Sequence, residues 1–235
     1  MTVAEPKDTR VSRGFDRLAP VYDLLAAVGS GNQIARARRS LLNEIPPGKR
    51  ALVLGDGTGQ FLCELMATGR VKQAVCIDAS PAMIDRASRR WQRQCRRSGA
   101  DPGSVEFRVG ALPLDDGPGG PYDLVCTNFF LDLFTNEEME PVFRQIDAAL
   151  APDGNWYYTD FRYPDRATHP LRYLSARVLV RCLYVFFGLV AGLRARALTD
   201  VKKTFESNEY QLVARTIVAF GALECAIFKK ARHTF

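Results

Sequence analysis

The fold of this chain is decided by Arg50-Ala51-Leu52-Val53-Leu54-Gly55-Asp56-Gly57-Thr58-Gly59. A short apolar run leads directly into a turn that has glycine at alternate positions. A second apolar run further on ends in an acid, in Val75-Cys76-Ile77-Asp78. A strand, a glycine turn, a helix and a strand that ends in a carboxylate form the nucleoside-binding unit of a doubly wound sheet. We therefore expect backbone to approach a ligand at the glycines and Asp78 to accept hydrogen bonds from ribose hydroxyls.

The spacing of the glycines indicates which nucleoside is bound. A dinucleotide site has the pattern G-x-G-x-x-G, in which amides at a helix start face a pyrophosphate. The pattern here is G-x-G-x-G, and Gln60 stands where the last glycine of the dinucleotide pattern would be. Taken alone, the glycines are also compatible with a tight loop that binds nothing.

The ordered series of motifs resembles the class I S-adenosylmethionine-dependent methyltransferases, from about residue 14 to the end. The glycine turn is similar to their motif I, and the branch with ubiquinone and menaquinone C-methyltransferases is the most similar. The further matching pieces are Phe15…Ala19…Tyr22-Asp23, Asp78-Ala79-Ser80-Pro81-Ala82-Met83, Tyr122-Asp123-Leu124-Val125 and Leu150-Ala151-Pro152-Asp153-Gly154. The resemblance implies a Rossmann-like α/β fold with a seven-stranded, mostly parallel sheet and one antiparallel closing strand. It also implies N-terminal helices, a helical cap insertion, S-adenosylmethionine as cofactor and S-adenosylhomocysteine as product.

Periodicity and turn signals divide the chain into elements within one domain, 1–235. Expected strands are 50–54, 75–78, 105–109, 122–127 and 156–160, with a closing antiparallel pair at 210–217 and 222–231. Expected helices are 15–42, from Gly59 to about Gly69, 81–97 and 136–150, with Ser80 as N-cap, Pro81 at the first helical position and a turn at 152–154. The expected parts are an N-terminal helical lid (14–48), a cofactor-binding core (50–161), a helical cap insertion (168–198) and a closing helix with a strand pair (199–231).

The resemblance implies a set of cofactor contacts. Backbone at the glycines would follow the methionine half, Ala79 and Met83 would pack on adenine, and Tyr22 would close over the cofactor. The full set is Tyr22, Gly55, Asp56, Gly57, Gly59, Asp78, Ala79, Met83, Gly110, Ala111, Thr127 and Asn128. Tyr22 and Met83 are also compatible with plain core positions, and Asp78 with an acid at a helix start.

Three positions depart from the family pattern. Val53 stands where the family usually has an acid, Asp56 where a small residue is commoner, and Gly110-Ala111 where Asp-Ala is usual. Asp56 is either a charge for the cofactor's ammonium group or a turn residue. The departures leave open a domain that binds the cofactor without catalysis.

The acceptor side is less clear from the sequence. Methyl transfer is an in-line displacement that depends on alignment and exclusion of water, and a base is needed only if the acceptor loses a proton. Candidate bases are His169, Asp132 and Tyr163, with Asp160 as a further one. For His169 the alternative, a solvated loop residue, is the preferred interpretation. The apolar segment 171–193, which carries Arg172, Arg177 and Arg181, is a cap packed on the sheet, a lid over an apolar acceptor, or a surface that contacts the bilayer.

Charge, cysteine spacing and the lack of targeting signals limit the classes of protein to which this chain could belong. The formal net charge of +6 comes largely from the run 86–97, which predicts a solvated basic helix face or an anion-binding one. No nucleic-acid motif accompanies it, and the six cysteines show no C-x-x-C pair, so we expect no nucleic-acid partner and no metal. Residues 1–8 predict no secretory signal, and no apolar run predicts a spanning helix. We expect a cytoplasmic methyltransferase for a small apolar acceptor, in peripheral membrane contact if 171–193 provides it. The alternatives are a non-catalytic cofactor-binding domain and an aminopropyl transferase.

Overall fold

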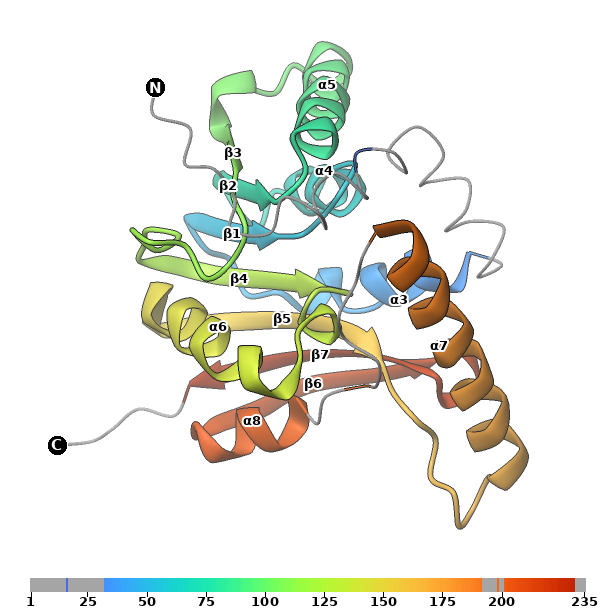
Figure 1. Ribbon diagram of the computed structural model, residues 1–235. Helices are drawn as coiled ribbons and strands as arrows, with labels where there is room; N and C mark the ends of the chain where they lie inside the picture. The colour runs from blue at the N-terminus through green and yellow to red at the C-terminus, as the bar shows by residue number, and fades with distance from the viewer. Residues whose placement is uncertain (1–15, 17–31, 192–197, 199–200, 231–235) are drawn as a thin grey trace, which may run out of the picture.

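The computed structural model describes residues 16, 32–191, 198 and 201–230. Its strands are β1 Arg50–Leu54, β2 Gln73–Asp78, β3 Val105–Val109, β4 Tyr122–Asn128, β5 Leu150–Phe161, β6 Tyr210–Val218 and β7 Leu223–Lys230. They form a seven-stranded sheet in the order β3-β2-β1-β4-β5-β7-β6 (Figure 1). Strands β1 to β5 pair in parallel, and β7 runs antiparallel to both β5 and β6. The expected doubly wound sheet with an antiparallel closing strand is therefore confirmed.

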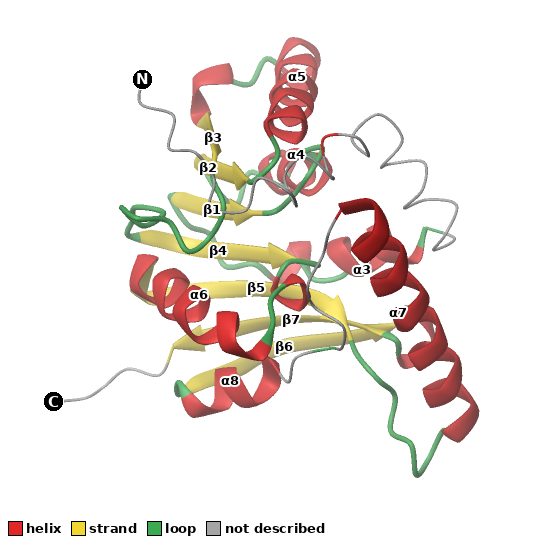
Figure 2. Ribbon diagram, in the orientation of Figure 1, coloured by secondary structure: helices red, strands yellow, loops and turns green. Residues whose placement is uncertain are grey.

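Helices cover both faces of this sheet (Figure 2). The α-helices are α3 Gln33–Arg39, α4 Gln60–Ala67, α5 Pro81–Ser98, α6 Asn136–Ala149, α7 Pro170–Ala191 and α8 Val201–Ser207, and the short 3₁₀ helices are η1 Leu42–Glu44, η2 Pro102–Ser104, η3 Leu131–Leu133 and η4 Ala219–Gly221. Apolar side chains of α4 and α5 pack against one face of the sheet, and those of α6 and α8 pack against the other. The two resulting cores hold the strand ends in fixed positions, and these ends carry the site.

Local sequence explains where the helices begin. The Ser80 hydroxyl accepts a hydrogen bond from the Met83 amide at 3.1 Å, with Pro81 at the first helical position, as the sequence predicts. Helix α6 begins with a capping box in which Thr135 and Glu138 satisfy each other's backbone amides. These caps fix the starts of the two helices that follow β2 and β4.

The expected start of the fifth strand is wrong. Strand β5 begins at Leu150, directly after α6, and the predicted turn at 152–154 lies within it. Tyr122 pairs with Leu150 but Leu124 already pairs with Asn155, so residues 151–154 bulge opposite a single residue of β4. A bulge of this kind accommodates the turn-forming residues 152–154 without ending the strand.

The site forms where the parallel strands end. In Figure 1 the arrowheads of β1, β4 and β5 point toward one edge of the sheet, and α7 crosses that edge. Open α/β sheets bind ligands at the carboxyl ends of their strands. Residues 14–15 and 17–31 of the expected N-terminal lid, which include Tyr22, lie outside the described residues, so the position of Tyr22 remains a prediction.

Candidate active site

The glycine turn after β1 is built by close packing as well as by backbone conformation. Gly55 and Gly59 have positive φ values of 64° and 76°, which side-chain-bearing residues rarely adopt. A Cβ on Gly55 would collide with the Phe130 ring, and one on Gly59 would lie 2.7 Å from Ala87 Cα on α5. The glycines thus allow the turn to press against its neighbours, in addition to leaving room for a ligand.

Asp78 closes this turn from the end of β2. Its Oδ2 accepts a hydrogen bond from the Gly57 amide at 3.0 Å, and its Oδ1 accepts one from the Ser80 amide at 2.9 Å. Burial raises the pKa of Asp78 to about 6, although both amide hydrogen bonds lower it. Each carboxylate oxygen has further lone pairs, so the group can still accept hydrogen bonds from the two hydroxyls of a ribose.

Asp16 is a neighbour of this carboxylate that the sequence analysis did not single out. Its Oδ1 accepts hydrogen bonds from the Ser80 hydroxyl at 2.5 Å and from the Ala82 amide at 3.2 Å. The contact places Asp16 at the start of α5, beside Asp78. The available signal was an acid inside the Phe15…Tyr22-Asp23 motif, but nothing local indicates which helix it caps.

Asp56 is used by the fold. Its carboxylate is buried and accepts hydrogen bonds from the amides of Phe61 at 3.2 Å and Leu62 at 2.8 Å, at the start of α4. Arg38 on α3 lies 3.8 Å away. Burial raises the pKa of Asp56 to about 6, and the Arg38 charge opposes that shift. The geometry favours the turn-residue interpretation, and a cofactor contact through this side chain stays a prediction.

The expected adenine side lies next to Asp78. The Gly110 amide donates to the Asp78 carbonyl at 3.0 Å, and a Cβ on Gly110 would lie 2.7 Å from Leu114 Cδ2. Met83, in the first turn of α5, is 1% exposed, and Ala79 and Ala111 are partly exposed. The structure therefore gathers these four positions near the ends of β2 and β3.

The end of β4 provides an unpartnered polar group. The Thr127 hydroxyl accepts a hydrogen bond from Trp156 Nε1 at 2.8 Å, so this side chain serves the core. Asn128 is 5% exposed, and its Oδ1 is buried without a hydrogen-bond partner among the described residues. Buried polar atoms are rarely left unsatisfied, so Asn128 is suited to receive a donor from a bound molecule.

Comparison with known proteins agrees with this geometry. A family model described as a methyltransferase domain matches residues 51–154, which run from β1 into the bulge of β5. That stretch of the chain therefore resembles a methyltransferase domain.

One curated protein that this chain resembles is named for an O-methyltransferase activity. The malonyl-[acyl-carrier protein] O-methyltransferase of Halorhodospira halophila is 32% identical over 157 residues, which are 64% of this chain and 48% of that protein. The chain thus spans about half the length of this curated relative.

Solved structures share the fold. The N-methyltransferase NodS of Bradyrhizobium japonicum WM9, in complex with S-adenosylhomocysteine, superposes with a TM-score of 0.66 at 16% identity over 95% of this chain and all of that one. An O-methyltransferase family 2 protein of Planctomyces limnophilus in complex with apigenin gives 0.65 at 14% identity over 92% of this chain and 62% of that one. At these identities the likeness establishes the fold alone.

The edge of the sheet where an acceptor is expected (the acceptor edge) holds two buried acids. Asp132 in η3 and Asp160 at the end of β5 are 5% and 2% exposed. The Asp132 amide donates to Asp160 Oδ2 at 3.2 Å, and the Tyr184 hydroxyl on α7 lies 3.2 Å from the Asp132 carbonyl oxygen and 3.4 Å from its Oδ2. Burial raises the pKa of both carboxyl groups, and each also affects the other. Three segments distant in the sequence meet here.

The other candidate bases lie elsewhere. His169 is exposed in the loop before α7, at the end of a segment that extends away from the sheet (Figure 1). Tyr163 is partly buried and packs against Val180 and Tyr184 of α7. Burial raises the pKa of Tyr163, so its hydroxyl stays protonated and is not available to take a proton. The solvated-loop interpretation of His169 therefore fits the structure better than a catalytic role.

Helix α7 has one buried face and one exposed face. Ala176, Val180 and Tyr184 are buried at helical spacing, whereas apolar residues on the opposite side are exposed. In the described part of the chain no helix has both the length and the apolar character to span a bilayer. The cap is therefore held at the strand ends by a narrow stripe of side chains.

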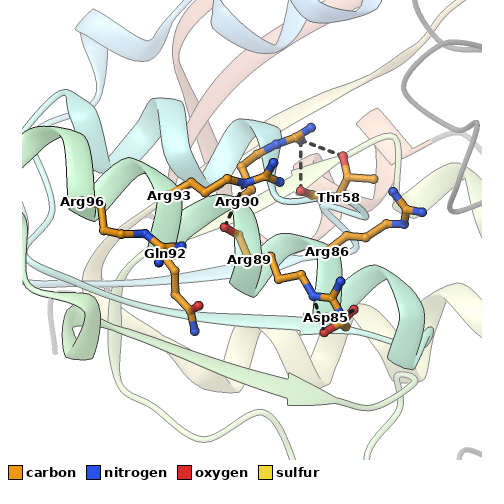
Figure 3. A pocket seen from close by; sticks show the side chains of 8 residues that line it. All are labelled: Thr58, Asp85, Arg86, Arg89, Arg90, Gln92, Arg93 and Arg96. Atoms are coloured by element: carbon orange, nitrogen blue, oxygen red, sulfur yellow. Dashed lines mark hydrogen bonds and ion pairs between the residues drawn. The ribbon is translucent and has the colours of Figure 1, made fainter.

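A basic groove lies outside the glycine turn (Figure 3). Its volume is about 420 Å³, and its lining residues are Thr58, Asp85, Arg86, Arg89, Arg90, Gln92, Arg93 and Arg96. Arg90 donates hydrogen bonds to the Thr58 carbonyl oxygen at 3.0 Å and to the Thr58 hydroxyl at 2.8 Å. These bonds link the glycine turn to α5. Exposed Arg89 pairs with Asp85 on the next helical turn. The groove accounts for the basic run in the sequence as a largely solvated face of α5.

Proposed function

We propose that this protein transfers the methyl group of S-adenosylmethionine to a small molecule with an apolar body. The single observation that carries the proposal is the Asp78 carboxylate, held between the Gly57 and Ser80 amides at the carboxyl end of β2. A carboxylate fixed in this way can accept both hydroxyls of one ribose. It is positioned at the edge where doubly wound sheets bind ligands.

The described residues fit the cofactor in two further respects. Gly55 and Gly59 have positive φ values that favour glycine, and as glycines they place no side chain in the turn. The unpartnered Asn128 Oδ1 can accept a hydrogen bond from the amino group of the methionine half. When bound, the sulfonium supplies an activated methyl group, and the chain's part is to orient the acceptor and exclude water.

Apolar surroundings at the acceptor edge support an apolar acceptor. The ring centroids of Phe129, directly after β4, and Phe161, the last residue of β5, lie 5.1 Å apart. Tyr184 and Val180 of α7 pack against Phe161 from the cap side. An acceptor that enters between the cap and the strand ends would meet mainly aromatic and aliphatic surface.

Calorimetry with S-adenosylmethionine, S-adenosylhomocysteine and NAD tests the cofactor assignment. Binding of both methionine-derived ligands without binding of NAD is the expected result. Binding of NAD without binding of either methionine-derived ligand would contradict the proposal. Cofactor binding without turnover over a broad acceptor panel would favour the non-catalytic alternative, and transfer of an aminopropyl group from the decarboxylated cofactor would favour the aminopropyl transferase.

The exposed face of α7 supports a second element of the proposal, which is contact with an anionic membrane surface. Its large apolar residues that the structure describes as exposed are 44% to 83% exposed, namely Leu171, Leu174, Val178, Leu179, Val185 and Leu189. Arg172, Arg177 and Arg181 are also exposed, and residues 170–191 contain no Asp or Glu. Phe220 in η4 is 81% exposed and stacks near Arg172 at 5.8 Å. An apolar stripe with a basic border is typical of interfacial helices, and a bilayer would be the source of an apolar acceptor.

A fluorophore on Cys182 measures this contact, because Cys182 is exposed on α7 and the other five cysteines are buried. We expect a blue shift with vesicles of phosphatidylcholine and phosphatidylglycerol, and a smaller one with phosphatidylcholine alone. Leu189→Asp should abolish the shift. The matched control is Leu212→Asp, at an apolar residue 51% exposed on β6. An unchanged spectrum with anionic vesicles would contradict membrane contact without affecting the cofactor assignment.

A further inference from the structure

The basic groove on α5 carries more positive charge than the fold balances. Five arginines and one acid line it, which is an excess of four positive charges among the described lining residues. The acid, Asp85, is already engaged, because Arg89 Nη2 lies 2.9 Å from its carboxylate. Arg90 is held at the glycine turn by the Thr58 carbonyl oxygen and hydroxyl. The groove therefore has an excess charge that an anion would neutralise.

The remaining three arginines of the groove, Arg86, Arg93 and Arg96, are exposed. Arg86 and Arg96 form no hydrogen bond or ion pair with the described residues. Arg93 uses only its Nε, which donates to the Arg89 carbonyl oxygen at 3.3 Å. The three follow one another at intervals of seven and three residues, which places them on one face of the helix (Figure 3). Like charges at such spacings repel, so an anion between them would stabilise this face.

The polar lining of the groove limits the kind of ligand. Among the described residues, arginine, glutamine, threonine and aspartate alone line it. A nucleic acid strand stacks its bases on aromatic side chains, a protein partner needs an apolar centre to its interface, and a bilayer needs apolar side chains beside the charges. The volume of about 420 Å³ is that of a small-molecule pocket. The groove therefore fits a small and highly charged ligand.

The charge and the residue type favour phosphate over carboxylate. The planar guanidinium group of arginine binds the oxygens of a phosphate in pairs. A terminal phosphate group carries about −1.5 to −2 charges near pH 7, so two of them balance an excess of four positive charges. Four carboxylates would be needed for the same balance, in a groove that has room for one small molecule.

We propose that this groove is a binding site for a small molecule with two or more linked phosphate groups, held by Arg86, Arg93 and Arg96. The inference goes beyond the proposed function, because none of the described lining residues belongs to the expected set of cofactor contacts. The groove is open to solvent, so the ligand enters it without displacement of any helix or strand. Thr58 and Arg90 then form its wall on the side of the glycine turn.

Four probes test the class of ligand: inorganic tripolyphosphate, inorganic phosphate, tricarballylate and an oligothymidylate. Each is titrated calorimetrically into the full chain at physiological ionic strength, without divalent cations. We expect tripolyphosphate to bind at least tenfold more tightly than inorganic phosphate or the tricarboxylate, because it combines charge with linked phosphate groups. Absence of tripolyphosphate binding, or equal affinity for the tricarboxylate, would overturn the proposal. Tighter binding of the oligothymidylate would replace it with a nucleic-acid backbone site.

Variants then locate the site on α5. Arg93→Gln and, separately, Arg96→Gln should each weaken tripolyphosphate binding at least fivefold, because each removes one charged donor. Arg97→Gln is the matched control: it removes the same charge from an exposed position of the same helix outside the groove, and should change the affinity less than twofold. Thermal melts check that all three variants are folded. Equal losses in the groove variants and the control would show diffuse attraction to a basic helix and would overturn the site.

Discussion

The half of the sheet that we propose for the cofactor (the cofactor half) and the half that we propose for the acceptor (the acceptor half) are built differently. The cofactor half uses backbone: the amides of Gly57 and Ser80 hold Asp78, and close packing holds the glycine turn. The acceptor half uses side chains from three distant segments, which bring together Asp132, Asp160 and Tyr184. Backbone sites tolerate little change and serve one ligand, whereas a side-chain site under a cap can be altered without rebuilding the sheet. Proteins that share this fold but differ in function are therefore expected to differ mainly in the acceptor half.

The largest effect is expected for Gly59→Ala, which tests whether close packing holds the glycine turn of the cofactor half. The new Cβ would lie 2.7 Å from Ala87 Cα at a φ of 76°. Left-handed backbone costs about 1–2 kcal/mol and overpacking about 1–3 kcal/mol more, so we expect the free energy of unfolding to fall by about 2–5 kcal/mol. Gly69→Ala is the control, because Gly69 has a φ of 68° with nothing within 4 Å. Denaturant unfolding should show the smaller loss there, and equal losses would mean that packing against α5 is unimportant.

The second prediction separates the two halves by ligand. Asp78→Ala removes the acceptor of two charge-assisted hydrogen bonds, each worth about 1.5–3 kcal/mol, so affinity for S-adenosylhomocysteine should fall more than tenfold. Asp132→Asn should leave that affinity within twofold. Calorimetry on both folded variants makes the comparison, and similar losses would show that the halves are not independent.

The third prediction concerns pH and the cofactor half. The Asp78 pKa is raised to about 6 by burial, and ribose hydroxyls bind its ionised form best. As pH falls through 6, the carboxyl group takes up a proton and must lose it to bind, so the dissociation constant should rise about tenfold between pH 7 and pH 5. Asp78→Asn should flatten this dependence. A wild-type affinity constant across this range would contradict the assignment of Asp78 to the ribose.

The smallest expected effect is in the acceptor half. Tyr184→Phe removes a hydroxyl that lies 3.2 Å from the Asp132 carbonyl oxygen, which should lower the free energy of unfolding by about 0.5–1.5 kcal/mol. Cofactor affinity should not change. Tyr173→Phe, at a partly exposed tyrosine of the same helix, is the control and should cost less. A thermal melt resolves the two, and an equal cost would argue against a role for the Tyr184 hydroxyl.

The cofactor half could be predicted from sequence because its signals are local. The strand–turn–strand pattern predicts β1, the glycine turn and Asp78, and the Ser80 cap and Pro81 predict the start of α5. Local signals left two interpretations of Asp56 open, a ligand contact or a turn residue, and the hydrogen bonds that it accepts from the start of α4 favour the second.

The acceptor half could not be assembled from sequence in the same way. Asp132 and Asp160 were separate candidates, and their pairing depends on η3 folding back over the end of β5. The exposed position of His169 likewise depends on the direction of the loop before α7. The early start of β5 was missed because Pro152-Asp153-Gly154 reads as a turn, whereas tertiary pairing with β4 continues the strand around it.

The position of β7 has a consequence for how the chain reaches its native state. The last strand of the described chain lies between β5 and β6. Its residues 223–229 pair with β5, and its residues 223–230 span the pairing with β6. During synthesis, β5 is therefore complete long before its neighbour exists, and it exposes an unpaired, aromatic edge at Trp156, Tyr157 and Tyr158. Such edges recruit other strands, which makes a partly made chain prone to aggregate. Nascent chains that end before β7 are accordingly the ones that most need a chaperone.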